Sequence, residues 1–328
     1  MRENFSLTID LENNTLFVVS DIHSFYSELI ASLKMAGYDK KNKSHILVVV
    51  GDVFDRGPDT VKLYKFLKKI PKSRRILIKG NHEDLYKELL SKDFPDIWDF
   101  TNHTVSTFCQ IAGYKEECLE YTKNWWDGNV SPSTKESKIY WNQIREIVAH
   151  HEITSWIFSD EWINYAEIGD YIFTHAFIPV GLTEHGKLLK NHVYRLLKED
   201  YFPISNWRES SDKEWYEARW ENPWLFYLYD LFKLEEENGK HLVVGHWHTS
   251  DFWEHIGHHK DSTEHSIFYS PGIIAIDGGV WYKGNSYYGT RTLYHPQNVL
   301  VIKNGVCYDQ TGEELKSCIV PIIETESA

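Results

Sequence analysis

Residues that can bind metal ions follow five apolar runs of the sequence, each at the point where the run ends. They carry carboxylate, carboxamide and imidazole groups, and no thiolate accompanies them. These candidate ligands are Asp21, His23, Asp52, Asn81, His175, His246 and His248. The runs are short and rich in β-branched or aliphatic residues, which predicts strands. Because α/β proteins place their sites at the carboxyl ends of parallel strands, we expect the seven side chains to meet in one crevice.

The kinds of ligand indicate the class of metal. Oxygen and imidazole donors without thiolate suit Mn²⁺, Fe or Zn²⁺ better than soft-metal or iron–sulfur chemistry. A single catalytic zinc ion usually takes about three protein ligands, so seven candidates exceed the need of one ion. We therefore predict two divalent ions, with Mn²⁺ as first choice, about 3.5 to 4 Å apart and bridged by one carboxylate. Asp52 is the expected bridge, since its strand lies in sequence between two others that end in ligands.

Glycines and one arginine accompany the candidate ligands. Gly51 and Gly80 stand where the backbone must turn sharply out of a strand and let a substrate approach. Arg56 is followed by Gly57-Pro58 and an expected helix, which places it at the rim of the crevice. A guanidinium group there can bind a phosphoryl group through two parallel hydrogen bonds.

The elements that must position these groups alternate between strands and helices over the first ninety residues. Strands are predicted at 15–20, 45–50 and 75–78, and helices at 25–36, 61–70 and 83–90. The run His45–Val50 is continuously apolar after its first residue, as is typical of a strand buried on both faces. This alternation predicts right-handed βαβ units and an α/β core.

The pattern changes between residues 91 and 168, where strands fade and tryptophans accumulate. Helical spacing over Lys138–Trp156 predicts a Trp-rich helical insertion at about 91–168, within a single domain spanning 1–328. Helices are predicted at 187–199 and 222–236, and strands at 171–174, 241–244, 273–276 and 299–302. The last two strands, with Gly-rich turns between them, suggest a second, more antiparallel sheet.

Composition excludes several classes of protein. The chain has 328 residues, 42% of them hydrophobic, so it can bury a sizeable core. Its net charge is −13, which argues against a binder of phosphate backbones, and we expect no nucleic-acid partner. No run approaches the ~18 to 20 apolar residues of a membrane helix, and the N-terminus lacks an apolar export signal. We therefore expect a cytoplasmic protein, without a membrane partner, whose four cysteines are reduced.

Three short motifs carry a resemblance to a known family. They are D-x-H at Asp21–His23, G-D-x-x-D-R-G at Gly51–Gly57 and G-N-H-E at Gly80–Glu83, followed in order by His175 and His246. The chain resembles the calcineurin-like metallophosphoesterases, and the Arg-Gly ending of the second motif resembles their phosphoprotein phosphatase branch, including serine/threonine phosphatases of bacteria and phages. The similarity covers Thr15–Leu90 and returns in short islands to about Val301. It implies an α/β fold of two stacked mixed β-sheets flanked by helices, with the insertion added.

The resemblance also implies roles for individual residues. One ion would be held by Asp21, His23 and Asp52, and the second by Asp52, Asn81, His175 and His246. A bridging water, acidified by both ions, would attack phosphorus in line. His82 would donate a proton to the leaving oxygen, with Asp55 holding its tautomer. Arg56 would bind phosphoryl oxygens, together with Asn81.

Three positions depart from the pattern of that branch. Its members commonly carry glycine after D-x-H, where this chain has Ser24, a change that could narrow the first loop. The branch usually has Gly-His followed by Thr-Pro, whereas this chain has Gly245-His246-Trp247-His248, as in the wider superfamily of phosphodiesterases and nucleases. There the second histidine binds the first ion, so His248 is predicted to be an extra ligand. The second arginine of the branch has no firm match, and Arg219 is a candidate for substrate binding.

These features predict a binuclear metal-dependent phosphoesterase that hydrolyses phosphomonoesters. The leading prediction is a protein serine/threonine phosphatase, so the partner would be a phosphorylated protein or a small phosphoester. A nucleotide hydrolase, acting on a dinucleoside polyphosphate or cyclic nucleotide, and a phosphodiesterase are the alternatives among enzymes. The alternative from another class is a catalytically silent metal-binding scaffold. His82 and Asp55 argue against that scaffold, because it would need no proton donor.

Overall fold

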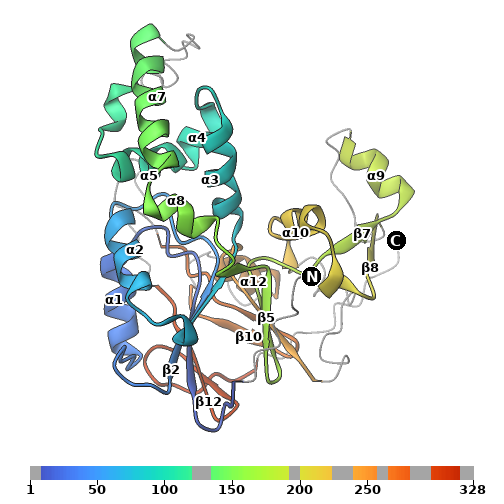
Figure 1. Cartoon of the computed structure of the whole chain (residues 1–328). Coiled ribbons are helices and arrows are strands. Elements are labelled where there is room, and N and C mark those ends of the chain that lie inside the picture. Colours follow the sequence, from blue (N-terminus) through green and yellow to red (C-terminus); the bar gives the residue numbers. More distant parts are fainter. Residues whose placement is uncertain are drawn as a thin grey trace.

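The computed structural model describes residues 9–119, 134–191, 200–223, 239–256, 265–280 and 297–317. Two mixed β-sheets lie face to face, and helices cover their outer faces (Figure 1). The predicted α/β fold of two stacked sheets flanked by helices is confirmed. Among the described residues, no helix combines the length and apolarity that crossing a membrane requires.

The first sheet has six strands in the order β13-β12-β1-β2-β3-β4. These are β1 (Thr15–Val19), β2 (His45–Val50), β3 (Arg75–Ile78), β4 (Trp162–Ile163), β12 (Leu300–Lys303) and β13 (Val306–Tyr308). The strands β1 to β4 are parallel to one another, and β12 runs antiparallel to β1. Since β2 lies between β1 and β3, the three motif-bearing loops leave the same edge of the sheet side by side.

The second sheet has five strands in the order β10-β11-β9-β6-β5. These are β5 (Tyr165–Ile168), β6 (Tyr171–Thr174), β9 (His241–Val244), β10 (Phe268–Ser270) and β11 (Ile273–Ala275). The central strands β6, β9 and β11 are parallel, and the two edge strands are antiparallel to their neighbours. A separate two-stranded antiparallel sheet pairs β7 (Val180–Leu182) with β8 (Tyr201–Pro203).

Alternation of side chains along β2 explains why this strand is apolar throughout. Ile46, Val48 and Val50 face the core between the two sheets. Leu47 and Val49 face the other way, into the core between the first sheet and its helices. A strand in this position has no solvent-facing side, which accounts for the continuous β-branched run.

Helices cover the outer faces of both sheets. On the side of the first sheet lie α1 (Tyr26–Met35), α2 (Thr60–Lys68), α3 (Asn81–Ser91), α4 (Ile97–Thr101), α5 (Thr104–Ala112), α7 (Lys135–Ala149) and α8 (Glu152–Ile157). On the side of the second sheet lie α10 (Asp212–Ala218) and α12 (Thr249–His255). The helix α9 (Glu184–Asn191), which lies between β7 and β8 in the chain, is seen beside the β7–β8 sheet at the right of Figure 1. Short 3₁₀ turns occur at Lys72–Arg74, Glu116–Cys118 and Trp207–Glu209.

The described part of the insertion is helical through α8, and its buried tryptophans pack into the core. Trp141 of α7 is fully buried and stacks on Phe108 of α5, with ring centroids 5.6 Å apart. The helix α7 presents Trp141, Ile144 and Val148 on its buried side, at the spacing of one helical face. Figure 1 shows α7 extending away from the sheets.

Some expected boundaries differ from the structure. Residues 162–168, expected in the helical insertion, form β4 and β5 and belong to the two sheets, so the helical part ends at Ile157. The strand expected at 299–302 does not join the second sheet, because β12 pairs with β1 in the first. The expected helix at 222–236 lies almost wholly outside the described residues, as does the second half of the helix at 187–199. Cys109, Cys118 and Cys307 carry free thiols, and Cys318 is not among the described residues.

Candidate metal centre

The loops after the parallel strands bring the candidate ligands together. Backbone hydrogen bonds continue past the strand ends, from Asp21 N to Gly51 O (3.2 Å) and from His23 N to Asp52 O (3.0 Å). The second sheet does the same, with Gly245 N donating to the His175 carbonyl oxygen (2.7 Å). The candidate ligands were expected in one crevice at the carboxyl ends of parallel strands, and they come from two sheets whose carboxyl ends meet there.

Asp52 lies at the middle of the cluster. Its Oδ1 is 3.3 Å from His175 Nε2, and its Oδ2 is 3.8 Å from His23 Nε2. On the first side, Asp21 Oδ1 lies 4.0 Å from His23 Nε2. On the second side, the ligand atoms of Asp52, His175 and His246 lie within 4.8 Å of one another. A carboxylate between two such groups has the placement that a bridging ligand needs.

Two of the histidines are oriented for binding through Nε2. His23 Nδ1 lies 3.0 Å from the Phe54 carbonyl oxygen, and His175 Nδ1 lies 3.0 Å from the Val50 carbonyl oxygen. A carbonyl partner holds a proton on Nδ1, so Nε2 is the ring atom that is available to a metal ion. The Nε2 atom of His23 is buried and has no hydrogen-bond partner in the structure. Such an atom is costly to bury unless a ligand binds it.

The amide of Asn81 sits among acceptor atoms. One of its terminal atoms lies 2.9 to 3.3 Å from both oxygens of Asp52, from His175 Nε2 and from His246 Nδ1. Only the amide NH₂ or a cation satisfies acceptors packed this densely. The donor set therefore fits a divalent ion bound by Asp52, Asn81, His175 and His246, with oxygen and imidazole ligands.

Strained backbone is concentrated in these loops. Seven residues have φ between 48° and 72°: Asp21, His23, Ser24, Asp52, Asp55, Arg56 and His246. Each left-handed non-glycine residue costs on the order of 1 kcal/mol, and such strain gathers at functional sites. Ser24 stands where members of the phosphoprotein phosphatase branch commonly carry glycine. Its hydroxyl lies 2.9 Å from Thr60 Oγ1 and so points toward α2.

Two glycines are required by the close approach of ligands. A Cβ atom at Gly51, whose φ is +80°, would lie 2.2 Å from His175 Nδ1. A Cβ atom at Gly80 would lie 2.1 Å from Asp52 Oδ1. Neither neighbour can move without leaving the cluster, so the glycines of the motifs are packing requirements of the metal centre.

The charges of the side chains in the cluster are unevenly distributed. Burial opposes protonation of His175, but the adjacent carboxylates of Asp52 and Asp21 outweigh it and raise the pKa of His175 to about 10. Burial and the nearby His175 lower the pKa of His246 to about 3. Burial and repulsion from Asp277 raise the pKa of Asp21 well above its usual range. A cation bound here would relieve the repulsion between the acids and displace the proton of His175.

His248 occupies a different position from the other predicted ligands. Its Nδ1 lies 3.0 Å from Oδ2 of Asp277, a carboxylate that is itself buried. Burial disfavours the charged form of His248, but Asp277 outweighs it and raises the pKa of His248 to about 9. The two groups of potential ligands found among the described residues, His23–Asp52–His82 and Asp52–His175–His246, do not include His248. Its assignment as an extra ligand stays a prediction.

His82 and Asp55 form a close pair beside Asp52. His82 Nδ1 lies 2.6 Å from Asp55 Oδ2, and both side chains are buried. The other ring nitrogen, Nε2, lies 3.4 Å from Arg56 Nη2 and 3.8 Å from Asp52 Oδ2. Arg56 is exposed, as expected for a residue at the rim. The structure thus gathers the three residues to which the resemblance assigns catalytic roles.

Arg219 has a different environment from that predicted for a phosphate ligand. Its side chain is buried, with Nε 2.5 Å from Asp84 Oδ2 and Nη1 3.1 Å from Asn164 Oδ1. Tyr216, one turn earlier on α10, donates to Glu88 Oε1 of α3 at 2.9 Å. These contacts join α10 to α3, so the position of Arg219 is explained by packing and lends no support to substrate binding.

The structure adds residues that sequence reasoning missed. Asp277 follows β11 as the other acids follow their strands, and the same signal could have found it. Glu83, the last residue of G-N-H-E, accepts hydrogen bonds from the backbone N–H groups of Asp52 (3.1 Å), Val53 (3.0 Å) and Gly80 (2.7 Å). Burial and the charge of Asp52 raise the pKa of Glu83 to about 7. Through these three hydrogen bonds, the side chain of Glu83 holds the second and third motifs together.

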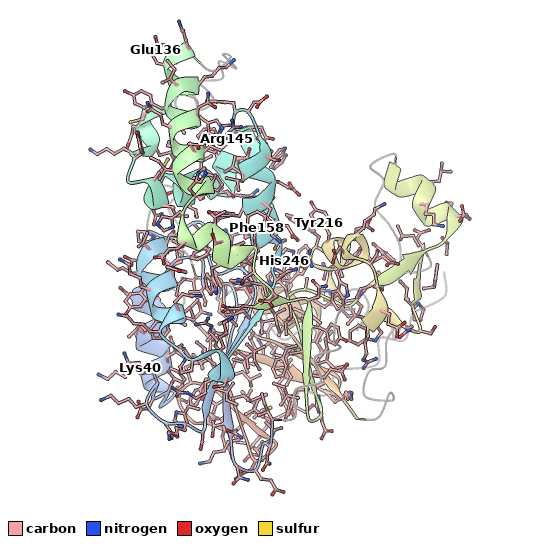
Figure 2. The ribbon with its side chains drawn as sticks, in the orientation of Figure 1. Lys40, Glu136, Arg145, Phe158, Tyr216 and His246 are labelled. Carbon is pink, nitrogen blue, oxygen red and sulfur yellow. The ribbon has the colours of Figure 1, made fainter. Side chains whose placement is uncertain are left out.

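Comparison with known proteins identifies the family. The sequence profile described as calcineurin-like phosphoesterase matches residues 15–276, which include every strand that carries a predicted ligand. The chain belongs to the calcineurin-like phosphoesterase family. The membership predicted from the three motifs is confirmed. Figure 2 labels His246, one of the predicted ligands, below Phe158 of the insertion and Tyr216 of α10 in that view.

Individual relatives match only part of this phosphoesterase. Asymmetrical bis(5'-nucleosyl)-tetraphosphatase PrpE of Bacillus velezensis is 35% identical over 80 residues, covering 22% of this chain and 32% of its own. Serine/threonine-protein phosphatase 1 of Salmonella typhimurium is 31% identical over 83 residues, covering 25% of this chain and 36% of its own. The chain thus spans about a third of the length of these curated relatives. A solved cold-active protein tyrosine phosphatase superposes with a TM-score of 0.49 and 16% identity, covering 96% of this chain and 82% of its own.

Proposed function

We propose that this chain is a metal-dependent hydrolase of phosphoesters. The observation that carries the proposal is the convergence on Asp52 of His23, Asn81, His175 and His246, with the His82–Asp55 pair alongside. A scaffold that only binds metal has no use for a buried imidazole–carboxylate pair whose Nε2 faces the ligand cluster.

Each group has a role in this proposal. Asp21, His23 and Asp52 would hold one divalent ion, and Asp52, Asn81, His175 and His246 the other. Bound divalent ions would supply charge neutralisation and an activated water molecule. Arg56, exposed at the rim, would bind phosphoryl oxygens and orient the phosphate. His82, held by Asp55, would protonate the leaving oxygen.

The leading substrate class is a phosphomonoester, with phosphorylated serine or threonine in proteins as the first choice. The Arg56-Gly57 ending of the second motif and the partial match to a bacterial serine/threonine phosphatase support this choice. The acidic net charge neither favours nor opposes it, since the metal ions dominate the field near the site.

A small nucleotide is the second candidate substrate, and one observation favours it. Trp220 is 39% exposed and lies edge-on to His246, with ring centroids 5.8 Å apart. An exposed indole beside a phosphate site can stack on a nucleobase. The partial match to a bis(5'-nucleosyl)-tetraphosphatase supports the same class.

Restoring activity with metal tests the proposed function. Chelator-stripped protein should not hydrolyse p-nitrophenyl phosphate, and added Mn²⁺ should restore turnover. Hydrolysis of bis-p-nitrophenyl phosphate instead of the monoester would favour the phosphodiesterase alternative. Turnover of neither ester with Mn²⁺, Fe²⁺ or Zn²⁺ would contradict the proposal and favour the scaffold.

The variant Trp220→Ala distinguishes the two substrate classes. If nucleotides are the substrate, the loss of stacking should raise KM for diadenosine tetraphosphate about tenfold, since a base on an aromatic ring gains about 1 to 3 kcal/mol. The rate with a phosphoserine peptide should then be low and unchanged. If phosphoproteins are the substrate, the peptide should have the higher kcat/KM, and Trp220→Ala should leave the nucleotide KM as it was.

A further inference from the structure

The helix α5 of the insertion makes direct contact with the Asp55 carboxylate. Thr107 Oγ1 donates to Asp55 Oδ1 at 2.6 Å and accepts from the Asp55 backbone N–H at 3.0 Å. Thr104 Oγ1 donates to Asp55 Oδ2 at 2.8 Å. The same Oδ2 is the partner of His82 Nδ1 at 2.6 Å. Both oxygens of this carboxylate are therefore held by hydroxyl groups from outside the family motifs.

The contact is enclosed by protein. Thr104 and Thr107 have no exposed surface, and Asp55 is 1% exposed. A buried carboxylate with donors on both oxygens cannot rotate without leaving hydrogen bonds unmade, which is costly away from water. The orientation of Asp55 therefore depends on α5.

The sequence of α5 explains how one helix makes these bonds. Thr104, Thr107 and Gln110 recur every three residues and so share one face of the helix. Gln110 continues the face, donating to the Gly57 carbonyl oxygen (2.9 Å) and accepting from the Thr60 backbone N–H (3.1 Å). The polar face thus follows the second motif loop from Asp55 to the start of α2.

The apolar side of α5 gives the polar face a rigid support. Phe108 stacks on Trp141 of α7 and lies against Tyr86 of α3, with centroids 5.6 and 4.7 Å away. Val105, Phe108 and Ile111 belong to the hydrophobic core between the first sheet and its helices. The aromatic packing of the insertion therefore fixes the position of α5, and with it the placement of Thr104 and Thr107 against Asp55.

We propose that Thr104 and Thr107 are positioning residues for His82, so that the Trp-rich insertion completes the active site. This inference rests on the proposed phosphoester hydrolysis, in which His82 is the proton donor. A fixed Asp55 accepts the Nδ1–H hydrogen bond, stabilises the doubly protonated imidazolium that a proton donor must be, and aims its Nε2–H at the leaving oxygen. Without the hydroxyls, Asp55 is free to turn, and proton donation by His82 becomes less efficient.

The experiment compares Thr107→Val with Thr107→Ser and with Ser106→Ala, which removes a hydroxyl from the same helix away from Asp55. Two substrates separate proton donation from the rest of the reaction. Phenyl phosphate has a poor leaving group that needs a proton, whereas 2,4-dinitrophenyl phosphate has a good one that does not. We expect Thr107→Val to lower kcat about tenfold or more with phenyl phosphate, a fraction of the full effect of general acid catalysis, and to change it little with the dinitrophenyl ester. Thr107→Ser should recover most of the loss, and Ser106→Ala should resemble wild type.

Equal losses with both substrates would overturn the inference, since they would mean that Thr107 supports the fold alone. If Thr107→Val does not fold, Thr104→Val is measured in the same way. Failure of the proposed function has its own signature, namely wild-type protein that hydrolyses neither ester. In that case the positioning role is tested by the downfield proton resonance of the His82 Nδ1–H, which is assigned by its loss in His82→Asn. It should shift in Thr107→Val and stay in Ser106→Ala, and an unchanged resonance in both would contradict the positioning role.

Discussion

Replacing Asp52 with asparagine is expected to remove both metal binding and turnover. The carboxylate lies between His23 on one side and Asn81 and His175 on the other, so its loss weakens both proposed ion sites at once. Metal ions supply several kcal/mol of transition-state stabilisation, so kcat/KM should fall by about 10³-fold or more. The change is measured as turnover of p-nitrophenyl phosphate together with bound metal by elemental analysis.

The controls for this variant address folding. Asp52 Oδ1 accepts a hydrogen bond from the His82 backbone N–H at 3.0 Å, which an asparagine oxygen can still accept. Melting in chelator checks that the variant is folded, and the loss of the Asp52–His175 ion pair should lower its melting temperature. Asp59→Asn changes a carboxylate that pairs with Lys62 outside the cluster and should leave metal content and turnover unaltered. Full metal content in Asp52→Asn would show that another residue bridges the ions.

The second large effect is expected from His82→Ala. This variant should keep its metal ions and lose turnover about 10²- to 10⁴-fold, the usual contribution of a general acid. The expectation follows from the His82–Asp55 contact at 2.6 Å, which orients the ring by its Nδ1 atom. Kinetics with phenyl phosphate and metal analysis of the same preparation test it together.

The geometry also defines the result that would contradict this role. His82 Nε2 lies 3.8 Å from Asp52 Oδ2, close enough for the imidazole to be a ligand instead of a proton donor. Parallel losses of metal and turnover in His82→Ala would assign it to the ligands. His150→Ala is the matched control, since His150 is an exposed residue at the end of α7 that pairs with Glu146 and does not belong to the ligand groups found in the described part of the chain.

Much of the central architecture could be predicted because local signals coincide there. The run His45–Val50 by itself predicts a strand buried on both faces, and Gly51 after it predicts a sharp turn of the backbone out of the strand. Parallel pairing then places Asp21, Asp52 and Asn81 at neighbouring strand ends. Ligands that follow parallel strands can be located in space without knowledge of the rest of the fold.

The parts that could not be predicted depend on contacts between distant segments. The strand β12 pairs with β1 across almost the whole chain, and its apolar residues fit either sheet equally well. Arg219 reads as a free cation until its buried partner Asp84 is known. The threonines of α5 recur at helical spacing, but hydroxyl groups occur on helices of every kind, so the spacing does not indicate a catalytic role. Their role is visible only once Thr107 is seen against Asp55.

The number of metal ions tests the central claim most directly. Chelator-stripped protein, reloaded with Mn²⁺ and freed of excess ion, should contain two ions per chain by elemental analysis, and Asp52→Asn should contain fewer than one. Two ions in wild type and their loss in the variant would establish the bridged centre on which the proposed function depends. One ion or none in wild type, or two in Asp52→Asn, would contradict it.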